Sequence, residues 1–455
     1  MRANEQILSQ ELRQRGLAAS SELTQACRIS QPTVSRTIHS FGSAVFRTGA
    51  GPSTRYGLYR GVRSHGRQWP LYVVDSEGEP HHGGALTSMH ERYFHISANE
   101  PLHPLLAGEF ASGLFRDLPW FLQDLRPQGF LGRAFARTHH LELSAPQDPR
   151  LWMADDILSG LLVNGHDNSG NIIVGDKSLN LFMSERASGI TPIPASQKLQ
   201  HYDPLANRTI AGEPCGSTAA GEQPKFCACI EDDNGAMRRV IVKFSPPRNS
   251  PAGVRWADLL CSEQTALSIL AQNGMPAAEA RLLQGENRTY FESTRFDRLG
   301  AHGRRGMVSL AAVDAAYFGE EQTPWYNCAE RLEQFGKLGE NEAATLRAYY
   351  WYGQLIANSD MHYGNASLFW DNAGFRTAPC YDMLPMAYSP REGGEIVNPE
   401  FRPVPAPPQY REEWQRAGQW ACDFWAAMAD DARVSPEFRG ISGANLRAVK
   451  DVLRN

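Results

Sequence analysis

Two spacings of apolar residues alternate along this chain of 455 residues and predict a mixed fold. Apolar residues three and four positions apart, the spacing of an amphipathic helix, occur in "DLPWFLQDLRPQGFLGRAFAR", "WADLLCSEQTALSILAQNG" and "LRAYYWYGQLIAN". Short runs rich in β-branched and aromatic residues, typical of strands, occur in "PLYVV", "FCACI", "RRVIVKF", "RTYFEST" and "ASLFW". Strands and helices are intermixed, so the pattern indicates an α+β fold.

Composition and charge narrow the class of protein. The hydrophobic content of 42% is that of an ordinary globular chain, and the length allows two or three domains. The first residues are too polar for a signal peptide and no apolar run could span a membrane, so we expect a cytoplasmic protein. The eight cysteines lack the spacing of a zinc site and are expected to be reduced. Residues 1–67 hold ten arginines and three glutamates although the net charge is −5, so a basic segment precedes an acidic body.

The basic segment has the pattern of a small DNA-binding unit over residues 1–64. In "SSELTQACRISQPTVSRTIHSFG" a short turn separates two helices that serines can cap, and "AVFRTGAGPSTRYGLYR" reads as two strands around a Gly-Pro tip. The side chains expected to face DNA are Gln31, Thr33, Ser35 and Arg36 of the second helix, and Arg47, Arg55 and Arg60 of the strands. These features predict a winged helix-turn-helix. Other three-helix units show similar patterning and some winged helices bind proteins, so both alternatives stay open.

A loop of small residues, "GSTAAGEQPK", precedes one strand and contains Ala220, Gly221 and Glu222. Small residues let backbone N–H groups approach phosphate oxygens, although a surface loop of this composition needs no ligand. The next strand carries Lys243, and an inward-pointing lysine needs a partner such as a nucleotide phosphate or a carboxylate. Glu263 on the following amphipathic helix could supply that carboxylate. Taken alone, either residue could equally be solvated.

The stretch "NSDMHYGNASLF" places Asp360 and Asn365 five positions apart between a predicted helix and a predicted strand, and Asp382 follows in "CYDMLP". Oxygen atoms of Asn365 and Asp382 suit Mg²⁺, and Asp360 could then accept the proton of a substrate hydroxyl. A purely structural role, in which Asp360 caps a turn, would account for that one residue. It would not account for the ordered set of loop, lysine, glutamate and aspartates. Protein kinases use this D-x-x-x-x-N spacing followed by a metal-binding Asp, so the set predicts a phosphotransferase that uses ATP and Mg²⁺.

With these motifs the chain resembles the HipA family of bacterial serine/threonine kinases, the toxins of some toxin–antitoxin pairs. The matching pieces are "AAGEQPK", "IVKF", "STRFDR", "NSDMHYGNASLF" and "CYDMLP", in the order of the family. The basic unit in front makes the chain similar to an orphan branch of that family. The resemblance implies a two-lobed protein-kinase-like fold after the winged helix, with an N-lobe over 65–296 and a mainly helical C-lobe over 297–455.

The resemblance also implies roles for single residues. Asp360 would be the catalytic base, Asn365 and Asp382 the magnesium ligands and Lys243 the ATP-binding lysine. Further nucleotide contacts would be Ala220, Gly221 and Glu222 of the phosphate loop, His362, and Thr294, Phe296 and Asp297 at the hinge. In the family a serine ahead of the loop is autophosphorylated, and Thr218 falls at that place here with Ser217 beside it.

The expected function is a growth-inhibiting serine/threonine protein kinase with its own DNA-binding unit. The resemblance implies a protein substrate, often translation-related such as an aminoacyl-tRNA synthetase. Further expected partners are DNA and a second copy in a homodimer, with no membrane, and the location is cytoplasmic or nucleoid-associated. The alternative is a DNA-binding transcriptional regulator whose kinase-like body senses a nucleotide. Toxicity that acts on DNA itself has no recognisable nuclease motif to support it.

Overall fold

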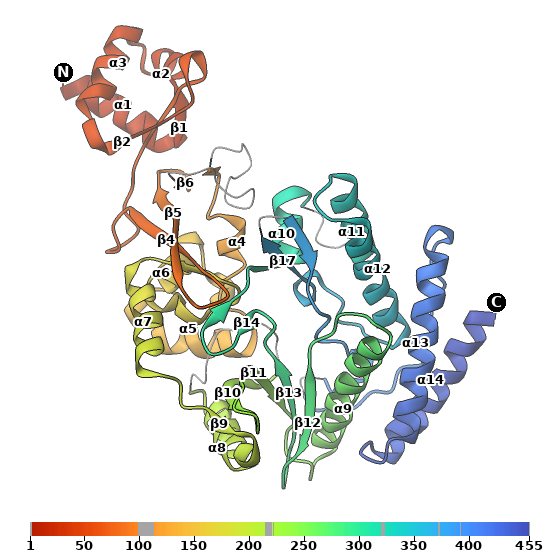
Figure 1. Cartoon of the computed structure of the whole chain (residues 1–455). Coiled ribbons are helices and arrows are strands. Elements are labelled where there is room, and N and C mark those ends of the chain that lie inside the picture. Colours follow the sequence, from red (N-terminus) through yellow and green to blue (C-terminus); the bar gives the residue numbers. More distant parts are fainter. Residues whose placement is uncertain are drawn as a thin grey trace.

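The computed structural model describes residues 2–98, 113–213, 221, 223–319, 324–371, 374–391 and 393–454. A small N-terminal unit stands at one end of the molecule, and the two long C-terminal helices lie side by side at the opposite end (Figure 1). Between these ends lie two five-stranded sheets and a helical region. One continuous apolar core runs from Val62 to Val449 and joins these parts.

The N-terminal unit contains the two helices and the two strands that the sequence predicted. Its elements are α1 (Arg2–Arg15), β1 (Leu17–Ala19), α2 (Ser20–Cys27), α3 (Gln31–Ser40), β2 (Val45–Thr48) and β3 (Arg55–Leu58). The strands form an antiparallel sheet in the order β1-β3-β2. Pro32 lies in the first turn of α3, where its missing N–H costs nothing, and Val34 and Ile38 face the core. Leu8, Leu12 and Leu23 complete that core.

A first five-stranded sheet follows, in the order β7-β6-β5-β4-β8. Its strands are β4 (Gln68–Val74), β5 (Pro80–Ser88), β6 (Phe94–Ser97), β7 (Leu114–Phe115) and β8 (Ile172–Val174). The helices of this region are α4 (Trp120–Gln123), α5 (Gly129–Leu143), α6 (Ala154–Asn164) and α7 (Asp176–Ser188). The N-terminal unit packs on this sheet through Leu17 and Phe46, which cluster with Met89 and Leu114.

The second sheet, in the order β12-β13-β11-β10-β9, positions the candidate site. Its strands are β9 (Ile193–Pro194), β10 (Lys225–Glu231), β11 (Met237–Phe244), β12 (Ala280–Gln284) and β13 (Thr289–Thr294). One face, with Val240 and Val242, packs on α8 (Lys198–Ile210). Alternate residues of a strand point to opposite faces, so Lys243 lies on the other face, where α9 (Pro251–Gln272) packs.

The rest of the chain is mainly helical, as predicted. It comprises β14 (Arg298–Leu299), β15 (Gly303–Arg304), β16 (Met307–Ser309), α10 (Leu310–Tyr317), α11 (Trp325–Gln334), α12 (Glu340–Leu355), β17 (Ser367–Asp371), β18 (Gly374–Thr377), α13 (Arg411–Asp430) and α14 (Pro436–Arg454). The segment 65–296 holds two separate sheets, a division that the sequence analysis did not anticipate. None of the helices in the described part of the chain is long and apolar enough to cross a bilayer.

Candidate active site

Lys243 of β11 lies at the centre of the candidate site. Its Nζ donates to both carboxylate oxygens of Glu263, at 2.6 and 2.7 Å, and to Oδ1 of Asp382 at 2.6 Å. The side chains of Lys243 and Glu263 are 7% and 1% exposed, whereas that of Asp382 is 24% exposed. A buried lysine therefore joins the sheet, α9 and the loop after β18. The structure brings together three residues that lie up to 139 positions apart in the sequence.

The charges of this cluster set its protonation. Burial alone would lower the pKa of Lys243, but the carboxylates of Asp382 and Glu263 outweigh burial and raise it. For Asp382, burial is outweighed by Lys243 and Lys225, so its pKa lies below the usual range. For Glu263 burial prevails, and its pKa is raised. Near neutral pH the cluster thus offers a charged lysine and a charged Asp382 to a ligand.

Asp360 and Asn365 lie on the loop between α12 and β17. The amide nitrogen of Asn365 donates to the backbone oxygen of Asp360 at 2.9 Å and to its Oδ2 at 3.3 Å. This arrangement leaves the amide oxygen of Asn365 as a ligand atom. Half of the Asp360 side chain is exposed, and Nε2 of His362 lies 3.7 Å from its Oδ1. The loop therefore presents a carboxylate that a substrate could reach.

Two hydrogen-bonding side chains, the buried Asn358 and the half-buried Tyr381, tie this loop to the segment that carries Asp382. Asn358 accepts from the backbone N–H of Asp360 at 3.0 Å and donates to the backbone oxygen of Asp382 at 3.4 Å. The hydroxyl of Tyr381 donates to the backbone oxygen of Gly364 at 3.0 Å. Asp382 itself has a φ of 51°, a strained conformation for a residue other than glycine and one that clusters at functional sites. Neither Asn358 nor Tyr381 was predicted as a site residue from the sequence.

A second buried lysine, Lys225, lies beside Lys243. The two residues are direct partners in the β10–β11 ladder, and Lys225 is 3% exposed. Burial lowers the pKa of Lys225, against the pull of Asp382. Lys225 is the last residue of the small-residue loop, and no role was predicted for it from the sequence. It is the residue that a count of charges on one face of the sheet would have found.

The small-residue loop is described only at its last positions. Gly221 has a φ of 101°, which requires glycine, and a Cβ there would collide with Nζ of Lys225. Its carbonyl accepts from the N–H of Phe130 at the start of α5, so the first sheet region anchors this loop. The remaining residues assigned to this loop or to autophosphorylation, which lie outside the described residues, are Ser217, Thr218, Ala220 and Glu222.

The predicted hinge follows β13. The N–H groups of Thr294 and Arg295 donate to the backbone oxygens of Glu279 and Arg239, both at 2.8 Å. The Phe296 ring packs against Tyr381 with ring centroids 5.7 Å apart, which places the hinge beside the Asp382 segment. Contact of Thr294 and Phe296 with a nucleotide stays a prediction.

Asp297, predicted as a nucleotide contact, bonds other parts of the protein. Its buried carboxylate accepts from the guanidinium groups of Arg295 and Arg298, at 2.9 and 2.6 Å, and from the N–H of Gly170 at 2.9 Å. These bonds hold β13 and β14 against the loop before β8. The side chain thus joins the two sheet regions, and a buried carboxylate between two arginines is costly to release. Its contact with a nucleotide stays a prediction.

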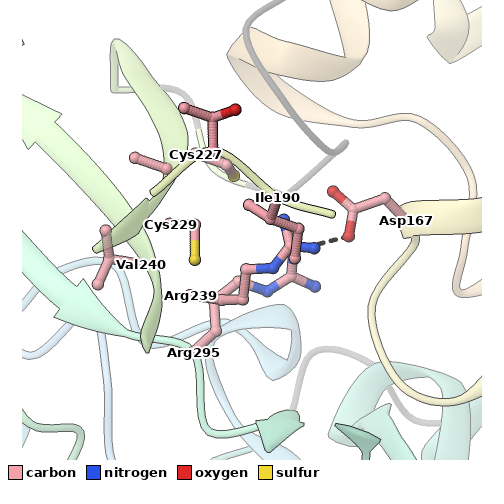
Figure 2. Close-up of a pocket in the computed structure, with 9 residues that line it drawn as sticks. Asp167, Ile190, Cys227, Cys229, Arg239, Val240 and Arg295 are labelled. Atoms are coloured by element: carbon pink, nitrogen blue, oxygen red, sulfur yellow. Dashed lines mark hydrogen bonds and ion pairs between the residues drawn. The ribbon is translucent and has the colours of Figure 1, made fainter. Parts of the chain in front are cut away.

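A pocket of about 170 Å³ opens on the same face of the second sheet as Lys243. Its lining residues are Asp167, Ile190, Thr191, Cys227, Ala228, Cys229, Arg239, Val240 and Arg295. Figure 2 shows the guanidinium groups of Arg239 and Arg295 side by side, facing Asp167 across the pocket. The pocket therefore adjoins the hinge.

Comparison with known proteins agrees with this geometry. The family "YjjJ-like toxin, middle domain" matches residues 65–183, and "HipA-like C-terminal domain" matches residues 217–447. Toxin YjjJ of Escherichia coli K12 is 35% identical over 430 residues, which are 94% of each chain. The chain belongs to the HipA family of toxins. Within that family it is similar to YjjJ, as the attached N-terminal unit had suggested.

Solved structures support the HipA-like fold. A chain in the Shewanella oneidensis MR-1 complex of HipA, HipB and operator DNA matches with a TM-score of 0.56 and 16% identity, over 85% of this chain and 96% of that one. The Helicobacter pylori proinflammatory kinase CtkA matches over 52% of this chain with a TM-score of 0.36 and 14% identity, too low a score to bear on the fold.

The N-terminal unit of this HipA-family chain leaves most of its predicted DNA-facing residues exposed. Exposed are Gln31, Ser35, Arg36, Arg47 and Arg55, and Thr33 is half-buried. Arg60 was expected beside them, but the structure places it elsewhere. Its guanidinium donates to both carboxylate oxygens of Asp155 at 2.7 Å and to the backbone oxygen of Met89 at 2.9 Å, so Arg60 attaches the unit to the body.

Proposed function

We propose that this HipA-family chain is a serine/threonine protein kinase that depends on ATP and Mg²⁺ and acts as a growth-inhibiting toxin. The observation that carries the proposal is the buried Lys243 between Glu263 and Asp382. Active protein kinases need a lysine–glutamate pair and a metal-binding aspartate in place together. The loop with Asp360 and Asn365 is tied to Asp382 through Asn358, so the catalytic groups share one rigid frame.

The residues divide the work of phosphoryl transfer. Lys243 and Lys225 would bind phosphate oxygens of ATP, and the adenine ring of ATP would lie toward the hinge. The oxygens of Asn365 and Asp382 fit Mg²⁺, which favours few protein ligands together with phosphate oxygens. When bound, Mg²⁺ would neutralise charge on the transferred phosphoryl group. Asp360 would orient the substrate hydroxyl and accept its proton, which contributes roughly 10²- to 10⁴-fold in rate.

Transfer of labelled phosphate from ATP tests this proposal on purified protein and on cell extract. We expect Asp360→Asn and Asp382→Asn each to lower transfer by at least about 100-fold. Asp371→Asn is the matched control, because Asp371 is a half-exposed aspartate near the same loop that forms an ion pair with Arg376. An extract protein labelled by wild type and control but by neither variant would identify the substrate. Equal labelling by all four proteins would contradict the proposal.

We also propose that the N-terminal unit is a winged helix-turn-helix that binds DNA. The order of its elements, three helices and a three-stranded antiparallel sheet, supports this assignment, as does the row of exposed arginines. The HipA neighbour occurs in a complex with HipB and operator DNA, whereas this chain carries the unit itself. The alternative function, a DNA-binding regulator that senses a nucleotide, keeps the same unit but needs no phosphate transfer.

Anisotropy of a labelled DNA duplex measures this binding. We expect a variant with Arg36, Arg47 and Arg55 changed to Gln to bind more weakly and with a salt dependence reduced by up to about three phosphate contacts. The control changes three exposed arginines of the body, Arg150, Arg391 and Arg402, to Gln. Equal loss in both variants would mean that DNA binds only through general charge.

A further inference from the structure

The pocket beside the hinge lies apart from the lysine and carboxylate cluster. Arg239 is four residues before Lys243 on β11, which separates their backbones by about 13 Å at the usual rise of a strand. Both side chains lie on the same face of the sheet. The loops that carry Asp167 and Ile190 close the far side of the pocket (Figure 2). The pocket shares Arg295 with the predicted hinge, but its lining does not include Lys243, Glu263, Asp360, Asn365 or Asp382.

Positive charge exceeds negative charge around this pocket. Four arginines lie close enough to Asp167 to influence its carboxylate, namely Arg239, Arg295, Arg298 and Arg304. Three carboxylates oppose them. Asp167 and Asp297 pair with Arg295 and Arg298, and Glu185 pairs with Arg239 at 2.5 Å. Within the described residues no carboxylate pairs with Arg304, whose guanidinium donates to the backbone oxygen of His166 and lies over the Phe182 ring.

Three buried polar atoms of this cluster have no hydrogen-bond partner among the described residues. They are Nε of Arg239, one terminal nitrogen of Arg304 and Nδ1 of His166. Buried polar groups in native proteins are nearly always paired, and an unpaired one calls for an explanation such as a bound ion. Two of the three belong to arginines, so the missing partner is an acceptor. Arg239 itself lines the pocket.

We propose that this pocket binds one small oxyanion of the phosphate class. A guanidinium group offers donors in a planar fork that matches phosphate oxygens. Arg239 and Arg295 both line the cavity; Asp297 holds the fork of Arg295, whereas Nε of Arg239 is an unpaired donor among the described residues. An oxyanion would balance the excess positive charge and give Nε of Arg239 an acceptor. A volume of about 170 Å³ suits a compact ligand. This site goes beyond the proposed kinase function and does not depend on it.

Equilibrium dialysis of full-length protein against labelled inorganic phosphate tests the proposal. We expect saturable binding that Arg239→Gln weakens by about tenfold, the effect of one lost charge-assisted hydrogen bond. Glu185→Gln should have the opposite effect and tighten binding, because it removes a negative charge and frees a donor of Arg239. Loss of fold cannot produce this tightening, so the pair of variants separates ligand binding from stability. Lys243→Met, at the nucleotide end of the sheet, should bind phosphate like the wild type.

Three results would overturn the proposal. They are the lack of saturable binding by the wild type, unchanged affinity in both Arg239→Gln and Glu185→Gln, and loss of binding in Lys243→Met alone, which would place the anion at the nucleotide site. Ribose 5-phosphate carries the same group on a larger body. Binding of either probe that responds to Arg239→Gln supports the site, and the tighter probe indicates whether the anion is free or part of a metabolite.

Discussion

Single buried charges decide how the lobes of this chain hold together, and Asp297 is the clearest case. Burial alone would raise its pKa, but Arg295 and Arg298 outweigh burial and hold the pKa of this carboxyl well below its usual range. We expect Asp297→Asn to lower the free energy of unfolding by about 3–5 kcal/mol, because it leaves two buried arginines without their shared carboxylate. Urea unfolding followed by circular dichroism measures this loss.

The pH dependence of this loss of unfolding free energy in Asp297→Asn gives an independent check. A carboxyl whose pKa is depressed by folding stabilises the protein above its unfolded value, about pH 3.9, and loses the contribution as the pH falls toward the folded value. The difference in free energy of unfolding between wild type and Asp297→Asn should therefore be largest at pH 6 to 7 and decrease below about pH 4. Asp371→Asn, which breaks an exposed ion pair, should change stability by less than about 1 kcal/mol. A normal stability of Asp297→Asn combined with weaker ATP binding would favour the predicted nucleotide role instead.

At the scale of elements, the hydroxyl of Tyr381 links the loop that carries Asp360 and Asn365 to the segment that carries Asp382, the proposed metal ligand. It bonds the carbonyl of Gly364, next to Asn365, while its own neighbour is Asp382. Partners behind metal ligands typically contribute 10- to 100-fold in metal affinity. We expect Tyr381→Phe to weaken Mg²⁺ binding in the presence of ADP by about tenfold and to leave ADP binding without metal unchanged. Calorimetry measures both affinities.

Tyr410→Phe serves as the control for that change. It removes a tyrosine hydroxyl that bonds Glu330 in the C-terminal helical region, whereas the Tyr381 hydroxyl bonds both Gly364 and Oγ of Ser367. Equal Mg²⁺ affinity in the two variants would show that Tyr381 merely packs. Parallel loss of ADP binding without metal would indicate that the whole site had loosened.

The elements also show which parts of the site a sequence can reveal. Lys243, Glu263 and the Asp360 loop follow from local patterns, because strand alternation and helical spacing fix the faces of these residues. Lys225, Asn358 and Tyr381 act through neighbours distant in the sequence, which no local spacing encodes. The division of 65–296 into two sheets was missed for a related reason, since local periodicity does not tell which strands pair, and the short strands β6, β7, β8 and β9 carry almost none.

At the scale of the whole molecule, the N-terminal unit is fixed to the body rather than loosely tethered. Arg60 forms a bidentate ion pair with Asp155, which lies in the first turn of α6. Arg63 forms an ion pair with the adjacent Asp156. Leu17 and Phe46 add an apolar contact with Met89 and Leu114. DNA bound by this unit would therefore keep one orientation relative to the kinase-like body.

Limited proteolysis tests this attachment at the connecting segment. Trypsin cuts after arginine, and the Arg60 side chain is engaged by Asp155, so we expect Asp155→Asn to speed cleavage after Arg60 on the order of tenfold, as for a lost charged hydrogen bond. Asp148→Asn, which releases only the exposed Arg150, should leave that rate unchanged. Unchanged cleavage in Asp155→Asn would assign the attachment to the apolar cluster alone. In that case Phe46→Ala, which removes a buried ring from the cluster, should produce the faster cleavage instead.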